Sequence, residues 1–125
     1  MIKFKAEVTG MGEFACDFLN DICNFIVIFN DDAPAELAEI CVLHEKTELK
    51  ADPCAGDTCI ICGHEYKISA VGWEALNTLR ELGHCTISFN GHDEAERPGM
   101  IELVGERITE EELRNGGYIE IFNEK

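Results

Sequence analysis

Basic residues and serines are scarce in this sequence. Its 10 Lys and Arg residues stand against 25 Asp and Glu residues, which gives a formal net charge of −15. Proteins that bind nucleic acid need a positively charged surface, so this composition excludes that class of partner. Ser69 and Ser88 are the only serines, and both fall within expected strands, where a serine nucleophile would be poorly placed.

Long apolar runs and the common catalytic motifs are also missing. The most apolar stretch, residues 25–29, is far shorter than the roughly 18 residues that cross a bilayer. The first five residues alternate charged and apolar side chains, unlike a signal peptide. There is no glycine-rich phosphate loop, no G-x-S-x-G and no H-E-x-x-H. We therefore expect a cytoplasmic protein that does not insert into the membrane.

The length and a weak internal repeat predict the organisation of the chain. A chain of 125 residues fits one domain, 1–125. Shifting the sequence by sixty residues against itself aligns two halves, about 1–60 and 61–125, without a gap, and we interpret this as a duplication. The matched positions include Gly12 with Gly72, Ala15 with Ala75, Leu19 with Leu79, Phe29-Asn30 with Phe89-Asn90, and Leu43 with Leu103.

Short strands dominate the expected secondary structure. Alternating and β-branched residues predict strands at 2–9, 25–29, 40–44, 58–62, 66–71, 85–89, 100–104 and 118–122. Helical segments are expected at 13–21 and 73–82, the second ending at Gly83, and Thr109 with Glu112 has capping-box spacing. The expected fold class is mainly β: a closed or partly open barrel of two strand–helix–strand–strand halves with one or two short helices.

His44 is the leading candidate for chemistry. An imidazole titrates near neutral pH and can act as a nucleophile. His44 ends an expected strand and breaks the internal repeat, because its counterpart is Val104. The alternative is an exposed histidine without a role.

The other three histidines have simpler alternative interpretations. His84 follows Gly83, where a cation is favoured near a helix C-terminus. His64 stands next to a glycine at an expected turn or strand edge, and His92 lies in a polar turn that faces water.

The seven cysteines include a string that resembles a metal-binding motif. Cys54, Cys59, Cys62 and His64 have the spacing C-x4-C-x2-C-x-H, and such ligands bind zinc or iron–sulfur clusters. However, the four residues share one stretch, and a strand would place Cys59 opposite to Cys62 and His64. In a cytoplasmic protein, cysteines more often act as small buried apolar residues. We expect no metal and no cofactor.

The sequence also resembles a known family, over residues from about 25 to about 104. The segments that carry the resemblance are 33–39 (APAELAE), 41–44 (CVLH), 48–50 (ELK), 69–72 (SAVG), 77–84 (NTLRELGH), 89–91 (FNG), 94–96 (EAE) and 98–99 (PG). They are similar to the glucitol/sorbitol-specific IIA component of the bacterial sugar phosphotransferase system.

The resemblance implies a single phosphocarrier domain. Such a protein accepts a phosphoryl group from the phosphohistidine of HPr and passes it to the IIB domain of the IIB/IIC permease, coupled to sorbitol uptake. His44 matches the histidine that becomes phosphorylated in the family. His84 and His64 also match histidines of relatives.

We expect His84 to stabilise a phosphoryl group on His44, with His64 as the weaker candidate. The strand that begins at His84 is expected to lie beside the strand that ends at His44, and Lys46 and Lys50 to supply positive charge. Two alternatives remain: a non-catalytic regulatory or binding module of the same fold, and a small Cys/His metal-binding protein.

Overall fold

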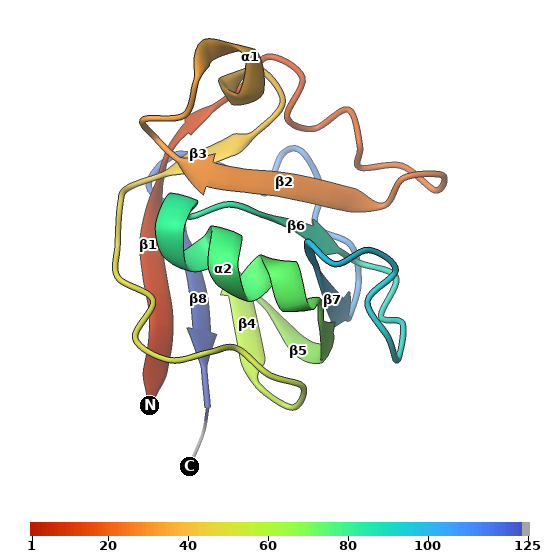
Figure 1. Ribbon diagram of the computed structural model, residues 1–125. Helices are drawn as coiled ribbons and strands as arrows, with labels where there is room; N and C mark the ends of the chain where they lie inside the picture. The colour runs from red at the N-terminus through yellow and green to blue at the C-terminus, as the bar shows by residue number, and fades with distance from the viewer. Residues whose placement is uncertain (124–125) are drawn as a thin grey trace.

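Strands form most of the computed structural model, which describes residues 1–123. Within this range, eight strands close into a barrel in the order β1-β3-β2-β6-β7-β5-β4-β8 (Figure 1). This confirms the expected mainly β fold. The elements are β1 (Ile2–Met11), β2 (Phe25–Asn30), α1 (Ala35–Ala38), β3 (Val42–His44), β4 (Thr58–Ile61), β5 (His64–Val71), α2 (Trp73–Leu82), β6 (Cys85–Ser88), β7 (Met100–Val104) and β8 (Tyr118–Phe122).

The strand pairing is nearly symmetric about the centre of the barrel. β2 pairs antiparallel with β6, and each of these strands pairs parallel with the next strand in the chain, β3 or β7. β4 and β8 pair antiparallel with each other. Exchanging each strand for the one about sixty residues away therefore reproduces the barrel order. This agrees with two related halves, although their origin by duplication and the division at residue 60 remain predictions.

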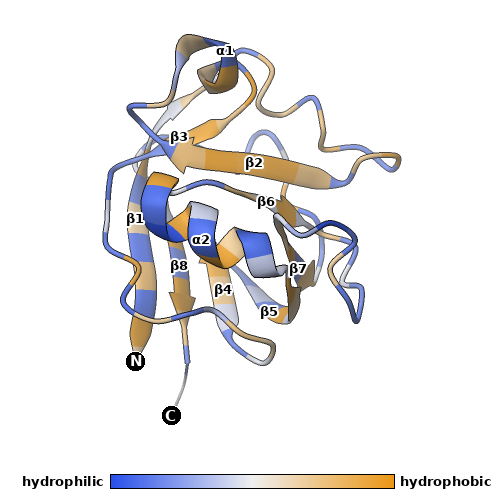
Figure 2. Ribbon diagram, viewed as in Figure 1, coloured by the Kyte–Doolittle hydropathy of each residue, from blue (hydrophilic) through white to orange (hydrophobic). Residues whose placement is uncertain are grey.

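The interior of the barrel is filled by alternate residues of the strands. In β1, Phe4, Ala6 and Val8 are almost completely buried, as the period of two residues requires. α2 covers one side of the barrel with Ala75 and Leu79, which lie one helical turn apart and are buried, while its other face is polar (Figure 2). Burial of these apolar faces stabilises the fold.

α2 ends at Gly83 as the sequence predicts. Gly83 has a left-handed φ of 62°, a conformation that glycine adopts without steric cost. Its N–H donates to the carbonyl oxygen of Leu79, and the N–H of His84 donates to that of Thr78. The bond from Gly83 is that of an αL C-cap, and both bonds satisfy carbonyl groups near the end of the helix where the chain turns into β6.

The expected helix at residues 13–21 is absent from the structure. That segment forms successive tight turns, in which Ala15, Asp17 and Leu19 donate their N–H groups to carbonyl oxygens three residues earlier. The side chain of Asn20 accepts hydrogen bonds from the N–H groups of Ile22 and Cys23 and so competes with helix formation. Tight turns and local side-chain bonding therefore replace the helix expected in the first half of the proposed repeat.

Two further segments differ from the sequence expectation. The acidic segment after Pro34 contains the one-turn helix α1, which the sequence pattern does not predict. At Thr109 one capping-box bond forms, because the side chain of Glu112 accepts from the N–H of Thr109 at 3.0 Å, but the segment is a turn and not a helix. Among the described residues, no helix combines the length and the apolar character that crossing a bilayer demands.

Candidate functional site

His44 lies at the end of β3, inside the wall of the barrel. Its pairing partners are Val8 of β1 and Asn30 of β2. The side chain is completely buried, and the ring of Phe4 meets its ring edge-on at 5.5 Å between centroids. The prediction that His44 ends a strand is confirmed, whereas the expectation that its side chain is open to solvent is wrong.

Backbone carbonyl groups hold both nitrogens of the His44 ring. Nδ1 lies 2.7 Å from the carbonyl oxygen of Glu45, and Nε2 lies 2.7 Å from that of Gly83. Carbonyl oxygens only accept hydrogen bonds, so a neutral ring donates to one of them and only a doubly protonated ring donates to both. The two contacts fix the orientation of the ring.

The two carbonyl groups differ in how firmly they are anchored. Glu45 belongs to the barrel wall, because its N–H donates to the carbonyl oxygen of Glu7, and the carbonyl of His44 accepts from the N–H of Asp31. Gly83 belongs to the C-terminal turn of α2, outside the strand ladder. From this difference we expect the contact at Nε2 to be the easier one to open.

Asn30 and Gly83 complete the surroundings of the ring. Asn30 is buried, and none of the described residues donates a hydrogen bond to its Oδ1. A Cβ atom added to Gly83 would overlap Asn30 Oδ1 and would lie 2.6 Å from Cε1 of His44. Only a glycine allows this close approach. The sequence analysis identified Gly83 as a helix cap and missed its contact with His44. It noted Asn30 only as the match of Asn90.

The ring of His84 contacts β2. Its Nδ1 lies 3.1 Å from the carbonyl oxygen of Ile28, and its ring lies 4.7 Å from that of Phe29. β2 separates β3 from β6 in the barrel, so the expectation that the strands of His44 and His84 lie side by side is wrong. The reason is that β2 pairs with both of them, parallel with one and antiparallel with the other.

His64 and His92 contact segments other than β3, the strand that carries His44. His64 begins β5, and its Nε2 lies 2.6 Å from a carboxylate oxygen of Glu112. Hydrogen bonds from Thr109, together with His64, lower the pKa of Glu112. His92 donates its backbone N–H to the buried carboxylate of Glu102 at 3.3 Å.

The cysteine string does not form one cluster. Cys54 is exposed, whereas Cys59 faces the core from β4, where burial raises its pKa to about 12. Cys62 has a positive φ of 47° in the turn between β4 and β5, so the expectation that Cys62 and His64 share one face of a strand is wrong. Among residues 1–123, no group of three or more His, Cys, Asp or Glu side chains is arranged to hold a metal ion.

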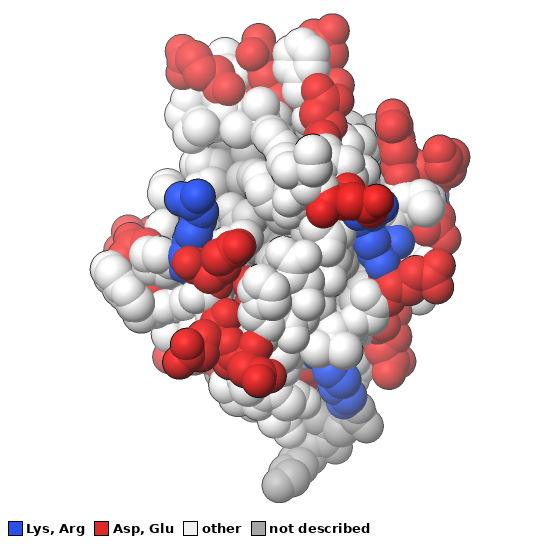
Figure 3. Space-filling model, turned by 90° about the vertical axis from the view of Figure 1, so that its right-hand side faces the viewer, with Lys and Arg blue, Asp and Glu red and all other residues white. Residues whose placement is uncertain are grey.

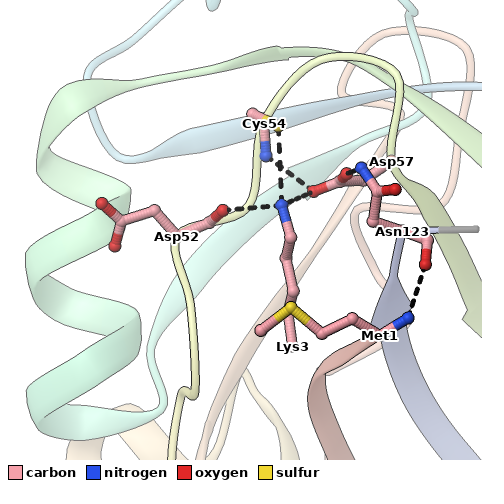
Figure 4. Close-up of polar contacts among 6 residues, drawn as sticks. All are labelled: Met1, Lys3, Asp52, Cys54, Asp57 and Asn123. Atoms are coloured by element: carbon pink, nitrogen blue, oxygen red, sulfur yellow. Dashed lines mark hydrogen bonds and ion pairs between the residues drawn. The ribbon is translucent and has the colours of Figure 1, made fainter. Parts of the chain in front are cut away.

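A buried ion pair, which the sequence analysis missed, lies at the other end of β1 (Figure 4). Lys3 Nζ donates to a carboxylate oxygen of Asp57 at 2.7 Å, to the carbonyl oxygen of Asp52 at 3.0 Å and to Sγ of Cys54 at 3.5 Å. Asp57 also accepts from the backbone N–H of Cys54 and from Nδ2 of Asn123. This network joins β1, the loop before β4 and the end of β8.

The two lysines expected to supply positive charge near His44 are Lys46 and Lys50, and both have other interactions. Lys46 Nζ lies 3.0 Å from a carboxylate oxygen of Asp32, and both side chains are exposed. Lys50 donates its backbone N–H to the carbonyl oxygen of Lys3, at the other end of β1. A positive field at His44 from these two lysines remains a prediction.

Comparison with known proteins gives one family. Residues 3–120 match the family described as the PTS system glucitol/sorbitol-specific IIA component. The glucitol/sorbitol-specific EIIA components of Escherichia coli (strain K12) and Shigella flexneri are each 38% identical over 104 residues, which is 83% of this chain and 83% of each relative. A PTS system IIA component from Enterococcus faecalis V583 shares the fold, with a TM-score of 0.77 and 23% identity over 93% of this chain and 97% of that one. The chain therefore belongs to the glucitol/sorbitol-specific IIA components and is a phosphotransferase component of the sugar phosphotransferase system.

Proposed function

We propose that this chain accepts a phosphoryl group on Nε2 of His44 from phosphorylated HPr and passes it to the IIB domain of a glucitol/sorbitol IIB/IIC permease. The exchange takes place in the cytoplasm. The observation that carries the proposal is the fixed geometry of the His44 ring, whose two nitrogens both lie 2.7 Å from backbone carbonyl oxygens. Each of the other three histidines contacts the rest of the protein through one ring nitrogen at most in the contacts described above.

The two carbonyl contacts of the ring favour Nε2 as the attacking nitrogen. A proton on Nδ1 that is donated to the anchored carbonyl of Glu45 leaves the lone pair on Nε2. That lone pair attacks phosphorus when the carbonyl of Gly83 moves aside. The Nε2–P bond forms as the P–N bond to the donor histidine breaks, and the bonding electron pair returns to the donor's nitrogen. The same exchange in the opposite sense delivers the group to the acceptor.

The protein contributes positioning to this step. Phosphoryl transfer demands in-line geometry and stabilisation of charge on the phosphoryl oxygens, with little covalent chemistry from other residues. Because the carbonyl of Glu45 holds the His44 ring at Nδ1, the ring is oriented for in-line attack. Because the ring is completely buried, the partner must gain access through the turn that ends α2.

His84 and His64 keep secondary places in this proposal. His84 is bonded through one peptide link to Gly83, whose carbonyl covers Nε2, so movement of that turn also moves His84. His64 is the weaker candidate, because Glu112 occupies its Nε2 and because β1 and β8 separate its hairpin from β3.

The proposal is tested by incubation with phosphoenolpyruvate, enzyme I and HPr, followed by intact-mass measurement. We expect one acid-labile phosphoryl group on the wild type and on the variant His92→Ala, and none on His44→Ala or His44→Gln. Thermal unfolding of both His44 variants establishes that they are folded, since removal of a buried ring can destabilise the barrel. Full labelling of a folded His44 variant would exclude His44. An unlabelled wild type would instead favour a non-catalytic module.

A further inference from the structure

The side chain of Asn30 is a buried polar group without a partner at the candidate site. Asn30 ends β2 and is 7% exposed. Its Oδ1 receives no hydrogen bond from any described residue. Native proteins rarely leave a buried acceptor unpaired, because its interaction with water is lost without replacement. Such a group calls for an explanation beyond packing.

Asn30 and the ring of His44 both lie against Gly83, whose carbonyl oxygen contacts Nε2. Asn30 is the pairing partner of His44 across the parallel strands β2 and β3, so both side chains stand at the same end of the barrel wall. The position of a Cβ on Gly83 would contact both Asn30 Oδ1 and Cε1 of His44, the ring carbon between Nδ1 and Nε2, and the carbonyl oxygen of the same Gly83 lies 2.7 Å from Nε2. The carboxamide therefore borders the space into which a group on Nε2 must extend.

We propose that the carboxamide of Asn30 binds the phosphoryl group on His44 by donating a hydrogen bond from Nδ2 to a phosphoryl oxygen. This inference rests on the proposed phosphorylation of Nε2. Rotation about the last side-chain bond of Asn exchanges the oxygen and the NH2 group, and that torsion has a broad energy profile. In the unphosphorylated protein Oδ1 faces this space, and after phosphorylation the rotated carboxamide presents the Nδ2 donor to the phosphoryl oxygens.

The internal repeat contains a matched residue in a different environment. Asn90 aligns with Asn30, but the residue that aligns with His44 is Val104. Asn90 is exposed, and its Oδ1 accepts a hydrogen bond from Asn24 Nδ2 at 2.7 Å. The same residue type is thus paired where no histidine is present, and Asn90 provides a matched control.

Asn30→Asp separates donation from shape, because Asp has nearly the same size but cannot donate when ionised. In single-turnover rapid-quench experiments with phosphorylated HPr near pH 7, we expect acceptance to slow by about 10²-fold, the usual effect of removing one donor from a reacting group. Asn90→Asp should retain the wild-type rate. As the pH falls, the ratio of the Asn30→Asp rate to the wild-type rate should rise, because a protonated carboxyl group donates again. The corresponding ratio for Asn30→Ala should stay low and constant.

A wild-type measurement makes the test independent of variant folding. The 15N and 1H resonances of the Asn30 side-chain amide should shift on phosphorylation, and its amide protons should exchange more slowly with solvent. An unchanged amide signal, a wild-type rate for folded Asn30→Asp, or a rate ratio that ignores pH would each overturn the role of Asn30 while leaving His44 labelled. Loss of labelling from the wild type would instead refute the proposed function itself.

Discussion

Lys3 and Asp57 form a buried pair whose contribution to stability depends on pH. Burial tends to raise the pKa of Asp57, but hydrogen bonds from Lys3, Cys54 and Asn123 outweigh it and hold the pKa below its usual range. The hydrogen bond to Asp57 raises the pKa of Lys3, against the opposing effect of burial. Asp57 therefore stabilises the fold above its unfolded-state pKa of about 3.9, and this is lost as the pH falls through its lower folded-state value. Lys3 contributes below its unfolded-state pKa, and its contribution is lost as the pH rises through the raised folded-state value.

Lys3→Met should lower the free energy of unfolding at pH 7 by about 3 kcal/mol, because it leaves a buried carboxylate without its partner. Urea denaturation measures this change. The matched control is Arg80→Met, which breaks the exposed pair of Arg80 with Asp52, also 2.7 Å long, and should cost less than about 1 kcal/mol. The difference between wild type and Lys3→Met should shrink as the pH falls below about 4. A difference that stays constant into strong acid would contradict the assignment.

β8 is the strand that closes the barrel. It lies between β1 and β4, so the first and last strands of the chain pair directly, with Ile2 opposite Phe122. Ile119 and Ile121 of β8 point into the core and are almost completely buried. Closure removes the free edges that β1 and β4 would otherwise expose.

Ile119→Ala should lower the free energy of unfolding by about 3 to 4 kcal/mol, through lost apolar burial and the cavity that remains. The control is Ile22→Ala in the turn segment, where the isoleucine is 95% exposed and the expected change is below about 0.5 kcal/mol. Chemical denaturation of both variants measures these changes in the free energy of unfolding. Equal stability of the two variants would show that β8 does not close the core as described.

The acidic character of the protein extends across its surface. Acidic side chains spread over the face shown in Figure 3, with few basic ones between them. With a net charge of −15, the protein attracts partners with a basic face and speeds their encounter, and salt screens that attraction.

The second-order rate of phosphoryl acceptance from phosphorylated HPr should therefore fall by about tenfold when salt rises from about 0.02 M to about 0.5 M. Rapid-quench kinetics at several salt concentrations measure the effect, and the first-order rate within the complex should change little. As a control, Asp32→Asn, which removes the one exposed carboxylate that pairs with Lys46, should weaken the salt dependence only slightly. A rate independent of salt would exclude electrostatic attraction as a contributor to this encounter.

The sequence by itself determined most of the strands, the helix α2 with its glycine cap, and the family. These features depend on local patterns: the period of two residues, the stripe of α2 and the left-handed preference of Gly83. Where a local pattern competed with local side-chain bonding, as at Asn20, the sequence prediction of a helix was wrong.

Only the tertiary structure decided which residues meet. The sequence marked His44, but the burial of its ring and its contacts with Gly83 and Asn30 arise from β2 lying between β3 and β6. Because β6 pairs with β2, the ring of His84 contacts Ile28 and Phe29 of β2, and its strand does not lie beside that of His44. Lys3 meets Asp57 because closure of the barrel brings distant segments together. Strand order is set by the packing of all strands at once, so no local pattern along the chain encodes it.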